Sequence, residues 1–161
     1  MVNISNLRKV LLIAFASLVL TACATQKKAG TGMMAGDVYT GTDTVKYLAT
    51  GVKDRVFFAT NKSTLTTASR DTLRKQAAWM RAKGKALSFT IEGHADERGT
   101  REYNLALGER RANAVKDYLM TYGISGGRLS VISYGKERPV NSGSNPLAWS
   151  QNRRSVTVKA E

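Results

Sequence analysis

The stretch EGHADERGTREYNLALGERRA, residues 92–112, links two different periodicities and carries nine charged side chains. Upstream, from Leu87 to Ile91, apolar residues alternate with polar ones, as in a half-buried strand. Downstream, residues 101–122 keep apolar side chains at helical spacing until Gly123. The stretch therefore predicts a strand that passes through a charged turn into a helix.

One arginine of this helix lies where an apolar residue is expected. At about 100° per residue, Arg111 falls in the middle of the apolar face, four residues from both Leu107 and Val115. An unpaired buried charge costs several kcal/mol, and the nearest acids are Asp96 and Glu97 in the preceding turn. Two interpretations stay open: Asp96 and Arg111 pair and stabilise the fold, or they are held close and bind an ammonium and a carboxylate separately. The second would make a receptor for a zwitterion.

The rest of the chain surrounds this unit with further strands and one more helix. The pattern predicts a strand at 52–58, a helix at 65–85, strands at 128–134 and 154–159, and a long loop at 135–150. Because each helix must bury an apolar stripe, the economical arrangement is an α/β domain, an α+β sandwich in which one sheet is covered by two main helices. We expect it to span residues 51–161.

The N-terminal residues have the pattern of an export signal. Residues 1–22 place two basic residues before an apolar run and end in small residues, which is typical of a signal peptide. The single cysteine, Cys23, follows at once, and LTAC resembles the bacterial lipobox. That resemblance implies an acylated Cys23, palmitate included, and Ala24 after it implies an outer membrane location facing the periplasm. Residues 23–50, rich in Gly, Thr and Ala, predict a flexible tether that is ordered only near its end.

The charge balance favours an anionic partner. The formal net charge is +13, and +11 without residues 1–22, which hold two basic and no acidic residues. Acidic wall polymer and lipid head groups fit this balance, whereas export argues against nucleic acid.

The same stretch offers little for catalysis. His94 is the only histidine, no GxSxG turn accompanies it, and one imidazole with Asp96 and Glu97 is a weak metal signal. We expect no metal, no cofactor and no catalytic residue, and a hydrogen-bonded structural role for His94. Arg153 and Arg154 are interpreted as the basic rim of a strand, and the loop with Trp149 as a cover for the sheet edge.

Longer motifs are similar to a known family. GHADERGTREYNLALGERRANAVKDYL, with ISYGKERP and NRRSV downstream, resembles the OmpA-like peptidoglycan-binding domain over about residues 52–159. The resemblance implies a β-α-β-α-β-β domain with one mixed sheet. It also implies non-covalent binding to the meso-diaminopimelate of the wall peptide, so that the protein would tether the outer membrane to the wall.

The resemblance also implies which residues bind. The aspartate of the GHxD turn, Asp96, meets the ammonium of diaminopimelate, and the arginine before Ala in LGxxRA, Arg111, meets its carboxylate. Asn104, at the YN position, supports the pocket. The rim loop, usually YFDFDK-like, reads FFATNK here and lacks both aspartates, which leaves Thr60 and Asn61 as expected contacts.

Three functional alternatives follow. In the first, the protein works with periplasmic Tol proteins and supports envelope integrity and cell division. In the second, a lipoprotein uses the same domain outside any Tol system. In the third, the protein is a wall-active hydrolase, which would need an acid and a base on opposite sides of the scissile bond. Asp96 and Glu97 are adjacent in sequence and cannot supply that arrangement.

Overall fold

The computed structural model describes residues 37–160. The predicted signal peptide and the lipidation of Cys23 lie outside these residues. In the described part, no helix has both the length and the apolar character needed to cross a membrane.

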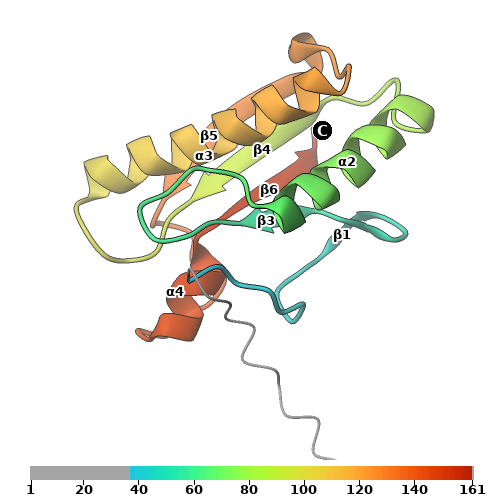
Figure 1. Cartoon of the computed structure of the whole chain (residues 1–161). Helices are drawn as coiled ribbons and strands as arrows, with labels where there is room; N and C mark the ends of the chain where they lie inside the picture. Colours follow the sequence, from blue (N-terminus) through green and yellow to red (C-terminus); the bar gives the residue numbers. More distant parts are fainter. Residues whose placement is uncertain (1–36, 161) are drawn as a thin grey trace, which may run out of the picture. The chain divides into compact units, whose positions relative to one another are not determined.

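The domain contains a four-stranded sheet covered by two long helices (Figure 1). In chain order the elements are β1 (Tyr47–Ala49), β2 (Val52–Lys53), β3 (Arg55–Phe57), α2 (Thr67–Ala82), β4 (Phe89–His94), α3 (Arg101–Thr121), the 3-10 helix η1 (Gly126–Arg128), β5 (Leu129–Gly135), α4 (Pro146–Asn152) and β6 (Arg154–Lys159). The strand order is β3-β6-β4-β5, with β4 parallel to β5 and the other pairs antiparallel. The predicted mixed sheet with two main helices is confirmed.

The elements begin where the sequence provides caps. The side chain of Thr66 accepts a hydrogen bond from the backbone N–H of Ser69 at the start of α2, and Thr100 accepts one from Tyr103 at the start of α3. Alternate residues of β4 point into the core formed with both helices. The buried core side chains are Leu48, Val56, Phe58, Leu73, Ala77, Met80, Phe89, Ile91, Ala112, Val115, Leu119, Ile124 and Leu129.

Two segments differ from the predicted pattern. The strand expected at 52–58 is divided at Asp54, whose buried carboxylate accepts hydrogen bonds from the backbone N–H of Lys46 and the side chain of Arg55. A hairpin of β1 and β2 therefore precedes β3. The expected loop at 135–150 contains the start of helix α4, which is capped by the Asn145 side chain and begins with proline, a common first helical residue.

A close backbone contact positions α3 on the sheet. A Cβ atom on Gly93 of β4 would lie 1.8 Å from the carbonyl oxygen of Gly108 in α3, which no side chain could tolerate. Glycine at both positions lets the helix touch the strand directly. Arg111, about one turn beyond this contact, is thereby held close to the end of β4.

Candidate functional site

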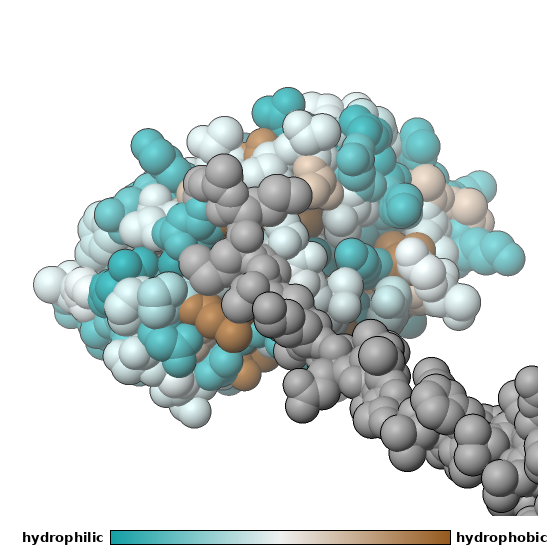
Figure 2. Space-filling model, turned by 60° about the horizontal axis from the view of Figure 1, so that its bottom comes forward, coloured by the Kyte–Doolittle hydropathy of each residue, from teal (hydrophilic) through white to brown (hydrophobic). Residues whose placement is uncertain are grey.

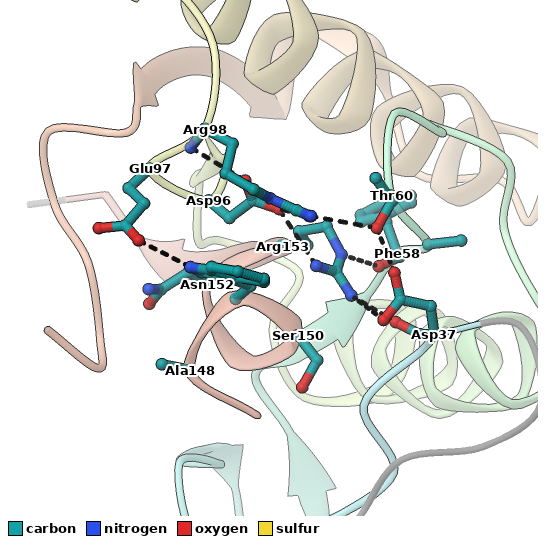
Figure 3. A network of polar contacts seen from close by, with 12 residues as sticks. Asp37, Phe58, Thr60, Asp96, Glu97, Arg98, Ala148, Ser150, Asn152 and Arg153 are labelled. Carbon is teal, nitrogen blue, oxygen red and sulfur yellow. Dashed lines mark hydrogen bonds and ion pairs between the residues drawn. The ribbon is translucent and has the colours of Figure 1, made fainter. Parts of the chain in front are cut away.

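The predicted site residues gather where β4 ends. The turn after β4 carries Asp96, the loop after β3 carries Thr60, and the junction of α4 with β6 carries Arg153 (Figure 3). Asp37, from the N-terminal end of the described chain, reaches the same place. Four segments far apart in sequence therefore form one polar network.

Asp96 is buried and accepts hydrogen bonds from two arginines. The backbone N–H of Arg98 donates to Oδ1 at 3.1 Å, and its Nε and Nη2 donate to Oδ1 at 3.0 Å and Oδ2 at 2.7 Å. Arg153 Nη1 donates to Oδ2 at 3.1 Å. Burial would raise the pKa of Asp96, but the hydrogen bonds from Arg98 and Arg153 outweigh it, and the pKa lies below its ordinary value.

Arg153 joins Asp96 to Asp37. Its side chain is 1% exposed, and Nη2 lies 3.0 Å from Asp37 Oδ1. The Thr60 hydroxyl donates to the other oxygen of Asp37 and accepts from Arg98 Nη2 at 3.3 Å. The ion pairs and hydrogen bonds thus close into a ring, and the interpretation of Arg153 as part of a basic rim is wrong.

Arg111 is fully buried and binds backbone carbonyl groups. Nε donates to Lys62 O at 2.9 Å, Nη1 to His94 O at 2.8 Å and Nη2 to Ala59 O at 3.1 Å. Its guanidinium also lies over the ring of Phe58, 5.3 Å from the centroid. These bonds hold the loop after β3 against the end of β4.

Asp96 and Arg111 form no ion pair with each other, and among residues 37–160 no carboxylate pairs with Arg111. The interpretation in which these two residues simply neutralise each other is therefore wrong. Burial, together with the positive charge of Arg153, lowers the pKa of Arg111 to about 10, and Asp96 opposes this shift. Arg111 is a buried cation whose charge is only partly compensated.

Asn104 and Asn61 lie at the margins of this cluster. Asn104 is buried, and its Nδ2 donates to the carbonyl oxygen of Arg98 at 2.8 Å, so it holds the turn that presents Asp96. Asn61 is exposed and has a positive φ of 56°, which helps the loop reverse direction. Neither side chain contacts Asp96 or Arg111 through a hydrogen bond in the described structure.

His94 is buried against Tyr134 and does not have the hydrogen-bonded role that the sequence suggested. Within residues 37–160 neither ring nitrogen has a hydrogen-bond partner. Burial lowers the pKa of His94 from 6.5 to about 3, with the charges of Arg154, Arg55 and Arg138 adding to the shift. No metal-binding cluster of His, Cys, Asp and Glu occurs in the described part of the chain.

Three residues beside Asp96 have roles that the sequence pattern did not indicate: Arg98, Ser144 and Trp149. Arg98 lies over the Trp149 ring, 4.3 Å from its centroid, and Trp149 Nε1 donates to Glu97 at 2.8 Å. Ser144 Oγ donates to the same carboxylate at 2.6 Å, and these two hydrogen bonds lower the pKa of Glu97. Trp149, which lies on α4, is therefore part of the site and does not act as a cover for the sheet edge.

One face of the domain is mostly polar. Figure 2 shows a face of the domain on which hydrophilic residues dominate and hydrophobic ones appear in small areas. A cleft of about 430 Å³ lies between residues 38–45, β3 and the start of α2, and none of the predicted site residues lines it. The charged network, not this cleft, contains the chemistry that the sequence singled out.

Comparison with known proteins identifies the family of the chain. A model described as OmpA family matches residues 57–153. A peptidoglycan-associated lipoprotein of Rhizobium meliloti is 48% identical over 147 residues, covering 88% of this chain and 82% of the relative. One from Pasteurella multocida is 40% identical, covering 94% and 97%. The chain belongs to the OmpA family, in the group of the peptidoglycan-associated lipoproteins.

Solved structures support the same fold. The crystal structure of the peptidoglycan-associated lipoprotein from Burkholderia pseudomallei has a TM-score of 0.64 and 35% identity, covering 67% of this chain and 91% of that one. The C-terminal domain of Helicobacter pylori MotB has a TM-score of 0.62 at 19% identity, which shows the fold alone.

Proposed function

We propose that the protein is a lipid-anchored protein of the outer membrane that binds peptidoglycan non-covalently and does no chemistry. The names of its relatives, which are 40% and 48% identical over most of both chains, support wall binding. The basic balance of the chain fits the carboxylates of wall peptides.

The ligand is the zwitterionic end of diaminopimelate. Its ammonium binds Asp96, and its carboxylate binds Arg111. The observation that carries this proposal is the only partly compensated charge of Arg111, which forms no ion pair with the nearby carboxylate of Asp96. An anion placed there would gain a charge-assisted contact that the ligand-free site lacks.

The geometry sets one requirement for this binding. Arg111 is fully buried, and the carbonyl groups of Ala59 and Lys62 cover part of its guanidinium. Three of its five N–H groups donate to carbonyls, which leaves two for a carboxylate. A ligand therefore reaches Arg111 only if the loop of residues 59–62, which includes Thr60 and Asn61, moves outward.

Acylation of Cys23 anchors the chain after removal of residues 1–22. Residues 23–50 connect this anchor to residues 51–161, and at their end β1, with the buried Leu48, already packs on the domain. Stable attachment needs more than one acyl chain, since a single chain binds membranes only marginally. A Cys23→Ser variant should move from the outer-membrane fraction to the soluble fraction. Retention of this variant in the membrane would contradict the anchor.

The protein acts within a Tol-Pal system that supports envelope integrity and cell division. Its periplasmic partners are Tol proteins, and a lipoprotein that works outside such a system is the alternative. Cross-linking in cells separates the two: recovery of Tol proteins supports the first, and recovery of wall fragments alone supports the second. A hydrolase would release soluble fragments from purified wall, whereas the proposed protein releases none.

The direct test is retention of the full chain, purified in detergent, on diaminopimelate-type and lysine-type peptidoglycan. We expect Asp96→Asn and Arg111→Met to lose retention while keeping a folded circular dichroism spectrum, and Arg101→Gln, which removes an exposed charge nearby, to retain it. Equal retention of all variants on both walls would mean that binding is nonspecific and that the two residues only stabilise the fold.

A further inference from the structure

Arg98 occupies the outer side of the Asp96 carboxylate. Its Nε and Nη2 contact both carboxylate oxygens, at 3.0 and 2.7 Å, and its side chain is 42% exposed. The other arginine on Asp96, Arg153, is 1% exposed and also pairs with Asp37, so it cannot leave without opening the network. A cation that arrives from solvent can therefore reach Asp96 only by replacing Arg98.

Arg98 is also held in this position by neighbours that belong to other segments. Its guanidinium lies 4.3 Å from the centroid of the Trp149 ring, and Nη2 donates to Thr60 Oγ1 at 3.3 Å. Glu97 fixes the indole by accepting its N–H at 2.8 Å. The hydrogen bond to Asp96 raises the pKa of Arg98, so the contact is favourable in the ligand-free protein.

We propose that Arg98 is an internal competitor that occupies the ammonium position of the site until a ligand displaces it. This inference rests on the proposed function and extends it to a residue that sets specificity. A guanidinium contacts both oxygens of a carboxylate, whereas an ammonium is a point charge and replaces that contact incompletely. A ligand must therefore gain the difference elsewhere, and its own carboxylate at Arg111 supplies it.

Arg98 thereby sets a threshold for binding. A ligand that offers an ammonium alone, as the lysine side chain of other walls does, has no second contact with which to offset the lost Arg98–Asp96 pair. A ligand that offers both an ammonium and a carboxylate has this second contact, at Arg111. We therefore expect simple amines not to bind this site measurably, although the carboxylate of Asp96 alone would attract any cation.

The test is titration calorimetry of the full chain in detergent with a soluble muropeptide that ends in meso-diaminopimelate. Arg98→Gln keeps most of the side-chain length and removes the charge. We expect it to bind the muropeptide about three- to tenfold more tightly, the range of a half-exposed pair with forked geometry. We expect a muropeptide with lysine in place of diaminopimelate, its carboxyl group blocked as an amide, to show no binding to the unsubstituted chain and measurable binding to this variant.

Arg101→Gln is the matched control. It removes one positive charge three residues from Arg98, and within residues 37–160 the only ion pair of Arg101 is the one with Glu137. Its affinity should stay within about twofold of the unsubstituted chain. In an NMR titration, the Nε–H signal of Arg98 should gain solvent exchange as the muropeptide binds, while that of Arg153 should not.

The outcomes separate the two proposals. Suppose that the unsubstituted chain binds the muropeptide and Asp96→Asn does not. If Arg98→Gln then binds equally or more weakly than the unsubstituted chain, the proposal that Arg98 competes with the ligand is wrong and the proposed function stands. If neither the unsubstituted chain nor Arg98→Gln binds, both are wrong. Tighter binding by Arg98→Gln, with the affinity of Arg101→Gln unchanged, supports both proposals.

Discussion

Arg111 and Arg153 are two buried arginines of one site, and they differ in what surrounds their charge. Arg153 contacts the carboxylates of Asp37 and Asp96, whereas Arg111 contacts three neutral carbonyl groups. Both side chains are almost completely excluded from solvent. Under the proposed function Arg111 binds the ligand and Arg153 does not, so burial alone does not distinguish the two roles. A buried charge that the fold has left without an opposite charge is the better indicator.

The largest expected effect on stability comes from substituting Arg153, the arginine whose charge is paired with carboxylates. Arg153→Met leaves Asp96 without its inner partner and Asp37 without its ion pair. Breaking a buried pair by removing one member typically costs about 3–5 kcal/mol, so we expect the free energy of unfolding in urea to fall by that amount at pH 7. A loss below about 1 kcal/mol would remove the distinction between the two arginines.

A second change tests what places Arg111 at its carbonyl groups. Gly93→Ala would put a methyl group 1.8 Å from the carbonyl oxygen of Gly108, so α3 must move away from β4. Overpacking of this kind costs about 1–3 kcal/mol, and the guanidinium should lose its contact with His94 O. Gly127→Ala is the control, because its nearest neighbour, Ser125 Oγ, is 3.8 Å away. Equal urea midpoints for the two variants would contradict the close contact.

His94 extends the comparison to a base that stays neutral beside Arg111. Its folded pKa of about 3 lies below the ordinary 6.5, so between these values the unfolded chain binds more protons than the folded one. Stability should therefore fall as the pH decreases, by about 2 kcal/mol between pH 7 and pH 5. His94 is the only histidine, so His94→Leu should flatten the urea-derived profile in this interval. A slope that survives the substitution would assign it to other groups.

The smallest expected effect on stability comes from substituting Arg111, the arginine without an ion pair. Arg111→Met removes three hydrogen bonds, but it also removes a desolvated charge, and these terms oppose each other. We expect a loss of about 1 kcal/mol in urea unfolding, well below that of Arg153→Met, together with loss of wall retention. If Arg111→Met were as destabilising as Arg153→Met, Arg111 would be a structural residue first.

The sequence predicted the parts of this site that depend on local period. The alternation around Phe89 and Ile91 indicated β4, and the wheel put Arg111 on the buried face of α3. Arg153 could not be recognised, because its partners Asp37 and Asp96 are 116 and 57 residues away in sequence. Nothing in the local pattern around Arg153 says which carboxylates the fold brings to it.

The other features that were not predicted are of two kinds. One has a signal in the local sequence, and the rest depend on tertiary contacts. Asn145 followed by proline is a helix-start pattern, so α4 could have been expected inside the loop. The role of Arg98 depends on Trp149 and Thr60, which reach it from two other segments. The unpartnered imidazole of His94 follows from packing against Tyr134, which periodicity does not encode.

The position of Asp37 has a mechanical consequence. Asp37 precedes β1 in the chain, and it is held by Arg153 and Thr60 within the ring that also holds Asp96. With the proposed anchor at Cys23, tension between membrane and wall would act on this ring through Asp37. The load would reach the ligand-binding network before it reached the sheet. Grip on the wall and force on the tether would then act through the same few side chains.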